Sequence, residues 1–148
     1  MERPWDVTLI EHLTAAGVRH ERLAVEEHRH RERKWRKVYG HAFRPGLRHR
    51  HGAKAVHEYL SEQATRWMLV PFLSNVPGTP MHVLPPPSSA FACEGPLLEL
   101  GEFGDIEFFI SPGDFSWTFV RTHEDFALSG PYFVRAEWVI AAGDAAAT

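Results

Sequence analysis

The segment "DIEFFISPGDFSWTFVRT", Asp105 to Thr122, decides the fold of this chain. Two runs with the aromatic and β-branched composition of strands flank Pro112-Gly113, a pair that suits the centre of a turn. Folding the chain symmetrically about this pair brings six apolar residues onto one face of a hairpin: Ile110 opposite Phe115, Phe108 opposite Trp117, and Ile106 opposite Phe119. Since an unprimed turn matches the twist of paired strands poorly, we expect a loop wider than two residues.

Three helices are predicted before this hairpin from apolar residues at helical spacing. The first begins at the capping residue Asp6 and runs to about Ala16, before a stop at Gly17. The second covers Glu26 to Phe43 and ends at Pro45-Gly46, and the third covers residues 53 to about 66. The residues expected to face inward are Leu9, Ile10 and Leu13, then Trp35, Val38, Tyr39, Ala42 and Phe43, and finally Val56, Leu60 and Ala64.

Three further segments are predicted to be extended: "VRHERLAV" (18–25), "WMLVPFL" (67–73) and Tyr132 to Val139. Pro71 would confine the second of these to a sheet edge or a bend. Six of the eleven prolines lie between Pro71 and Pro87, which favours a stiff crossover within one domain. The order of elements predicts an α+β fold, with N-terminal helices packed on a C-terminal antiparallel sheet that contains the aromatic hairpin. We expect one domain at 1–140 and a flexible tail at 141–148.

The composition is that of a globular protein without a membrane span. Of the 148 residues, 44% are apolar and 24% are charged, and no uninterrupted apolar run reaches the roughly 18 residues that a span needs. The first residues show no basic segment followed by an apolar run, so no leader is expected. The single cysteine, Cys93, excludes an intrachain disulfide and fits a reducing compartment. We therefore expect a cytosolic protein that does not contact a membrane, with Cys93 as a small buried residue.

Charge is divided between the two halves of the chain. Residues 1–60 hold 13 Lys and Arg against 8 Asp and Glu, whereas residues 61–148 hold 3 against 11. The basic segment 29–54 is the centre of the positive half. Within the second helix, four cations repeat at helical period on the side opposite Trp35 and Tyr39: Arg29, Arg33, Arg36 and Lys37. Because those two rings should face the core, they would be unavailable for stacking on bases, which favours a solvated face or an acidic protein partner over nucleic acid.

Histidine pairs raise the possibility of a metal site. His28 with His30 and His49 with His51 have one-residue spacing, which brings two imidazoles together on a strand and separates them on a helix. His28 and His30 lie on the predicted helix and should diverge, and the loop pair would need a third ligand from elsewhere. We therefore expect surface histidines and neither a bound metal nor another cofactor.

Two arrangements could support catalysis. Cys93 could act as a nucleophile beside His82 or His123. No serine lies in a nucleophile elbow, and the sequence has no phosphate-binding glycine loop. His123 and Glu124, in "THEDF" (122–126), could form an acid/base pair at the end of the hairpin. The same residues serve equally well as a turn in which Asp125 bonds to nearby backbone amides.

The segment "DFSWTFVRTHEDFALSGPYF" (114–133) resembles the C-terminal part of a family of small bacterial proteins of unknown function. "KWRKVYGHAF" (34–43) is similar to the Trp-containing helix of that family, whereas the basic loop 44–52 and the proline tract depart from its pattern. The resemblance implies a small cytosolic bacterial domain and no particular reaction. The residues that carry it in the C-terminal part are Phe115, Trp117, Thr118, Thr122, His123, Glu124, Gly130, Pro131, Tyr132 and Phe133.

The sequence therefore predicts a small protein-binding module, of which toxin neutralisation by an immunity or antitoxin protein is one form; that form rests on analogy alone. Its contact surface is either the basic helix face or an acidic edge of the hairpin. The acidic edge comprises Glu99, Glu102, Asp105 and Glu107. Two alternatives stay open: a small enzyme that uses His123 and Glu124, and nucleic-acid binding through the basic segment 29–54.

Overall fold

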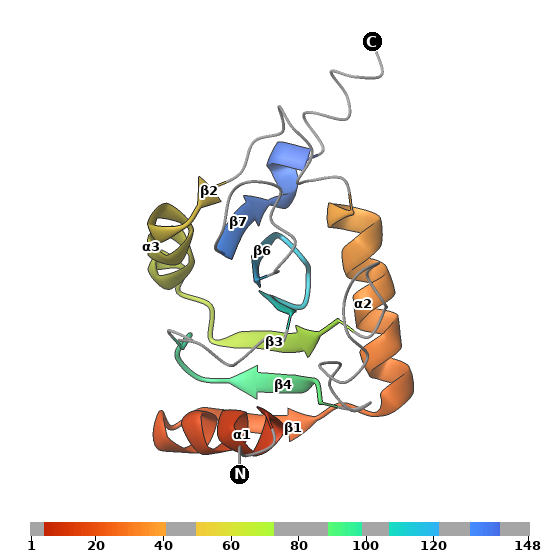
Figure 1. The fold of residues 1–148 in the computed structure, drawn as a ribbon, viewed down its shortest axis with the longest axis vertical. Coiled ribbons are helices and arrows are strands. Elements are labelled where there is room, and N and C mark those ends of the chain that lie inside the picture. The colour runs from red at the N-terminus through yellow and green to blue at the C-terminus, as the bar shows by residue number, and fades with distance from the viewer. Residues whose placement is uncertain (1–4, 41–49, 73–88, 99–106, 122–130, 140–148) are drawn as a thin grey trace.

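The structure is a computed structural model that describes residues 5–40, 50–72, 89–98, 107–121 and 131–139. These residues form an α+β fold in which helices pack on an antiparallel sheet, as predicted (Figure 1). In chain order, the elements are α1 (Trp5–Ala15), β1 (Arg19–Arg22), α2 (Val25–Tyr39), β2 (Arg50–His51), α3 (Ala53–Ser61), β3 (Arg66–Pro71), β4 (Phe91–Glu94), β5 (Phe108–Ser111), β6 (Trp117–Arg121) and β7 (Pro131–Arg135).

The described strands form one sheet in the order β1-β4-β3-β5-β6-β7-β2, and all neighbouring pairs are antiparallel. Figure 1 shows β3, β4 and β1 crossing the view side by side, with β6 and β7 turned away from their direction, so the sheet is strongly twisted. Charged side chains dominate β1, and β2 has only two residues. Short, charged edge strands disfavour pairing with a further chain.

Helices cover both faces of the sheet. On one face, Leu9 and Leu13 of α1 and Tyr59 of α3 pack with the side chains of alternate strand residues such as Leu69 and Phe119. On the other face, Trp35 and Tyr39 of α2 pack on the intervening strand residues. Figure 1 accordingly shows α2 and α3 on opposite sides of the sheet. Because both faces are covered, all four residues of β5 are buried, including Ser111.

The aromatic hairpin forms, but its register differs from the symmetric one. Ile110 lies opposite Phe119, and Phe108 lies opposite Arg121. The expectation of a wide loop is confirmed, because residues 112–116 separate β5 from β6 and the Phe115 amide donates to the Pro112 carbonyl at 3.0 Å. The predicted position of Phe115 was wrong: its ring packs on the α2 face of the sheet, and its φ of 56° bends the chain out of the strand.

Strand β3 is central, which corrects the expectation that Pro71 would place it at an edge. It pairs with β4 on one side and with β5 on the other. Pro71 is tolerated because it is the last residue of the strand, and the ladder continues past it through the Phe72 amide, which donates to the Glu107 carbonyl at 3.0 Å. Strand β4 was not predicted, and its four residues, "FACE", are too short a signal to detect from periodicity.

Helix α1 agrees with the sequence prediction. Leu9 and Leu13 are buried, and Gly17, at a φ of +76°, ends the helix while the Val18 amide donates to the Leu13 carbonyl. The predicted cap at Asp6 was wrong, since the helix begins at Trp5 and Asp6 lies inside its first turn.

The other two predicted helices were too long, as was the last strand. α2 ends at Tyr39 and is followed by Gly40. Any residue with a Cβ at position 40 would collide with the Arg36 carbonyl. α3 ends at Ser61, and its buried residues are Ala55 and Tyr59. Of the residues predicted to face inward, Val56 and Ala64 pack partly buried on this core, whereas Leu60 is 41% exposed. β7 stops at Arg135, and a single helical turn at 136–139 replaces the rest of the predicted strand.

Candidate functional site

Helix α2 carries the candidate site, and its buried stripe orients it. His28, Glu32, Trp35 and Tyr39 are buried at spacings of four, three and four residues, which places them on one side of the helix. Acidic residues in the first turn and basic residues in the last turn complement the helix dipole. The buried stripe fixes which side of α2 faces the sheet and leaves the exposed charged residues on the other side.

Trp35 is the central anchor of α2. Its ring stacks on Phe109 at a centroid distance of 5.3 Å and meets the edge of Phe72 at 4.9 Å. Its indole N–H donates to Thr118 Oγ1 at 2.8 Å, so the polar atom of this buried ring is satisfied. The prediction that Trp35 faces the core is confirmed, and its ring is unavailable for stacking on bases.

Tyr39 fastens the C-terminal end of α2 to the hairpin loop. The fully buried hydroxyl donates to the Phe115 carbonyl at 2.6 Å, and burial raises the pKa of the phenol well above its ordinary value. The bond holds Phe115 in its left-handed backbone conformation, which costs energy for a residue with a side chain. Tyr39 therefore confirms the predicted inward orientation and explains how the wide loop keeps its shape.

His28 corrects the expectation that the histidines are surface residues, because its side chain is fully buried. Its Nε2 lies 2.7 Å from the Pro71 carbonyl oxygen, to which the neutral imidazole donates. Desolvation lowers the pKa of His28 below 6.5, and it outweighs the opposite effects of the Pro71 hydrogen bond and the Glu32 charge. The expected divergence from His30 is confirmed, since His30 is exposed.

The buried imidazole predicts a pH-dependent stability. Because the folded pKa is lowered, the unfolded chain binds the proton more readily, so the contribution of His28 is complete above pH 6.5 and is lost as the pH falls below that value. Urea unfolding at a series of pH values between about 5 and 8 should show a steeper loss of stability on acidification for the wild type than for His28→Gln. His30→Gln, at an exposed position, should keep the wild-type slope. Equal slopes for the wild type and His28→Gln would contradict the assignment.

The four cations predicted to form a binding face all lie exposed on the outer side of α2: Arg29, Arg33, Arg36 and Lys37. Arg36 lies 3.8 Å from Glu32 and stacks over the Phe72 ring at 5.3 Å. For Arg29, Arg33 and Lys37, no carboxylate of the described residues lies within ion-pair distance. The outer face of α2 therefore presents cationic groups whose charge the described part of the chain does not neutralise.

One more cation, Lys34, extends this face, and Arg31 lies on the edge of α2 that turns toward the sheet; neither was singled out from the sequence. Lys34 is exposed and lies over the Phe115 ring at 5.2 Å, and Arg31 pairs with Glu27 at 2.6 Å. The sequence signal for these two residues is their position on the helical wheel. Lys34, for example, directly follows Arg33 and therefore points to a different side, toward the hairpin loop. We call Arg29, Arg33, Lys34, Arg36 and Lys37 the cationic face of α2.

The predicted acidic edge is mostly outside the described residues, which include Glu107 but not Glu99, Glu102 or Asp105. Glu107 is half-buried, and its carbonyl accepts the Phe72 amide at the end of β3. Its backbone thus supports the sheet. The acidic edge stays a prediction from the sequence.

The candidate catalytic and metal-binding residues lie mostly outside the described part of the chain. This holds for His123, Glu124, His82 and His49, and the His51 side chain is not described. Cys93 is buried as predicted, and burial raises its pKa to about 12, which keeps it a protonated, weakly nucleophilic thiol at neutral pH. Within the described ranges, no three His, Cys, Asp or Glu side chains gather closely enough to hold a metal ion.

Among the described helices, none has both the length and the apolar composition to cross a membrane.

The resemblance of residues 114–133 to a bacterial family stays a prediction. Comparisons of the whole chain with protein-family models, curated proteins and solved structures found no match.

Proposed function

We propose that this protein is a protein-binding module whose contact surface is the cationic face of α2 and whose partner presents an acidic surface. The observation that carries the proposal is the uncompensated charge of Arg29, Arg33 and Lys37 on a helix whose aromatic residues are locked inside. Charges at the rim of an interface accelerate association and select an oppositely charged partner. Neutralisation of a toxin by an immunity or antitoxin protein of the cytosol is the finer form of this proposal.

The geometry favours protein over nucleic acid as the partner. Trp35 and Tyr39 are the aromatic residues of α2, and both are buried, with their polar atoms bonded to β6 and to the hairpin loop. A nucleic-acid complex could therefore use the helix for phosphate contacts but could not stack bases on these rings. An acidic protein surface needs only the cations.

The test compares capture of an acidic protein partner by the wild type and by the triple variant Arg29→Gln, Arg33→Gln, Lys37→Gln. The partner is first isolated from an extract treated with nuclease and is then titrated in purified form. We expect the triple variant to bind at least about tenfold more weakly, since each exposed cation contributes a fraction of a kcal/mol. The charge-preserving variant Arg29→Lys, Arg33→Lys, Lys37→Arg should retain affinity and the salt dependence of binding.

Two results would overturn the proposal. One is wild-type affinity for the triple Gln variant, which would move the interface away from α2. The other is loss of all capture after nuclease treatment, which would favour the nucleic-acid alternative. Unfolding curves of both variants serve as the control, because exposed substitutions should change stability by less than about 0.5 kcal/mol each.

A further inference from the structure

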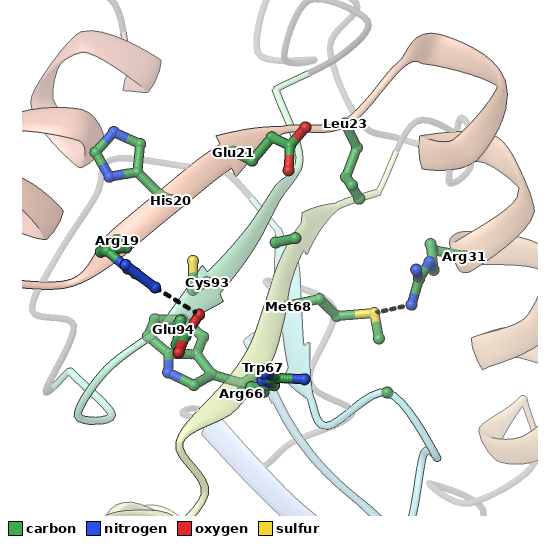
Figure 2. Close-up of a pocket in the computed structure, with 12 residues that line it drawn as sticks. Arg19, His20, Glu21, Leu23, Arg31, Arg66, Trp67, Met68, Cys93 and Glu94 are labelled. Atoms are coloured by element: carbon green, nitrogen blue, oxygen red, sulfur yellow. Dashed lines mark hydrogen bonds and ion pairs between the residues drawn. The ribbon is translucent and has the colours of Figure 1, made fainter.

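A hollow of about 450 Å³ lies where α2 stops covering the sheet (Figure 2). It lies on the α2 side of β1, β4 and β3 and is bounded by Arg31 of α2 and by Gly113 of the hairpin loop. Here the side chains of Glu21 and Glu94 are exposed, whereas α2 buries the neighbouring parts of β3 and β5. The hollow is therefore an opening in an otherwise covered face.

Two apolar side chains, Met68 and Ala92, lie in the middle of the hollow. Glu21, Ala92 and Met68 lie directly opposite one another on β1, β4 and β3, so they form one row across the strands. Met68 is 3% exposed and closes the floor toward α2. Ala92 has only a methyl group, which leaves space between its two larger neighbours. An aliphatic chain could lie along this row.

The end of the row near α2 is cationic. Arg31 is held from its Nε by Glu27 at 2.6 Å, which leaves its NH1 pointing at Met68 Sδ at 3.8 Å (Figure 2). A thioether sulfur is a weak acceptor, so this donor would bond more strongly to an anion. Arg66 lies two residues before Met68 on the same face of β3, and none of the ion pairs in the described residues involves it.

Arg66 forms no ion pair with Glu94, although the two residues are cross-strand neighbours. Glu94 instead pairs with Arg19 of β1 at 3.3 Å, as Figure 2 shows. This exposed ion pair turns the Glu94 carboxylate toward Arg19 and reduces its repulsion of an anion beside Arg66. Arg31 and Arg66 are thus the two cations that line the hollow at its β3 end.

The opposite end of the row is anionic. Glu21 is exposed on the outer strand β1, and no cation of the described residues pairs with it. Neighbouring strands lie about 4.8 Å apart, so Glu21 and Met68 are separated by roughly 10 Å across β4. The hollow therefore has a cationic end and an anionic end, with the apolar side chains of Ala92 and Met68 between them.

We propose that this hollow binds a small zwitterion of the ω-amino carboxylate class. Its carboxylate lies between Arg31 and Arg66, its methylene chain on Met68 and Ala92, and its ammonium group against Glu21. A chain of about five methylene groups is long enough for this row, because the distance between its two charged ends is most of the roughly 10 Å from Glu21 to Met68. This site is independent of the cationic face of α2 and needs no partner protein.

The test is a titration of the full chain with ε-aminocaproate, followed by calorimetry or by NMR shifts of Ala92 and Met68. Caproate lacks the ammonium group, hexylamine lacks the carboxylate, and β-alanine is too short to reach both ends. We expect ε-aminocaproate to bind about tenfold more tightly than each of these, which corresponds to one additional charge-assisted hydrogen bond.

Variants assign the two ends. Glu21→Gln should weaken ε-aminocaproate about tenfold without changing caproate, and Arg66→Gln should weaken both carboxylates without changing hexylamine. Glu26→Gln, an exposed carboxylate of α2 outside the hollow, is the matched control and should leave all affinities unchanged. The proposal is overturned if ε-aminocaproate does not bind at tens of millimolar, or if it binds no better than caproate and hexylamine.

Discussion

Replacing Trp35 with alanine is expected to destabilise the fold by about 3–5 kcal/mol, the usual cost of removing a large buried aromatic side chain. The indole is 4% exposed and lies between α2 and the sheet, in contact with Phe109 and Phe72. Its removal leaves a cavity and also deprives Thr118 Oγ1 of the indole N–H, although Thr118 keeps its own bond to the Ile110 carbonyl. Equilibrium unfolding in urea measures the loss.

Two further substitutions on the same helix give the comparison. Trp35→Phe should lose less, because a ring still fills most of the space, while the exposed Arg33→Ala should change stability by less than about 0.5 kcal/mol. A loss below about 1 kcal/mol for Trp35→Ala would mean that α2 does not pack on the sheet through this residue.

Replacing Tyr59 with alanine should have an effect of similar size, about 3–5 kcal/mol, from the opposite face of the sheet. The ring is 1% exposed and stacks on Phe119 at a centroid distance of 4.3 Å. Its hydroxyl donates to the Leu98 carbonyl at 2.6 Å, and burial raises the pKa of the phenol above its ordinary value. The residue joins α3, β6 and the segment after β4.

The conservative variant separates the two contributions of Tyr59. Tyr59→Phe keeps the stacked ring and loses one hydrogen bond, so we expect a loss of about 1 kcal/mol. Because Trp35 and Tyr59 lie on opposite faces of the sheet, the stability losses of the two alanine variants should add to within about 0.5 kcal/mol in the double variant, if it still folds. The double variant Trp35→Phe/Tyr59→Phe provides the same check with a smaller loss of stability. If Tyr59→Ala were no more destabilising than Tyr59→Phe, α3 would not cover this face.

The inward residues of α1 and α2 could be predicted because they recur along the sequence with the helical period. Leu9, Leu13, Trp35 and Tyr39 all face the core as their spacing indicates. The same spacing includes His28, but a histidine in a run of Arg and Lys is typical of a surface position. Its burial depends on the Pro71 carbonyl, which lies 43 residues away in the chain. A local pattern contains no information about such a partner.

In the hairpin, too, some features could be predicted from the local sequence and others depend on distant contacts. Its two strands are evident from composition, and the loop width follows from turn stereochemistry. The register depends on Phe115, which leaves the strand because its ring finds space beside Phe109 and its carbonyl accepts the Tyr39 hydroxyl. A contact from α2, whose Tyr39 lies 76 residues before Phe115 in the chain, thus decides which residues pair.

Of the two candidate sites, one could be predicted from the sequence and the other could not. Arg29, Arg33, Arg36 and Lys37 could be placed on one exposed face from the sequence, since a single helix carries them all. The hollow could not be predicted, because Glu21, Ala92 and Met68 become neighbours only when β4 pairs with both β1 and β3. Of those strands, β4 gives almost no signal in the sequence.

The sequence by itself determined the α+β class, the presence of the aromatic hairpin and the separation of rings from cations on α2. These properties follow from periodicity and turn chemistry, which act over a few residues. Only the tertiary structure decided the strand order, the hairpin register, the burial of His28 and the existence of the hollow. Those features depend on which distant segments bury their apolar surface against one another. The free energy of that burial depends on how all the segments pack in the folded molecule.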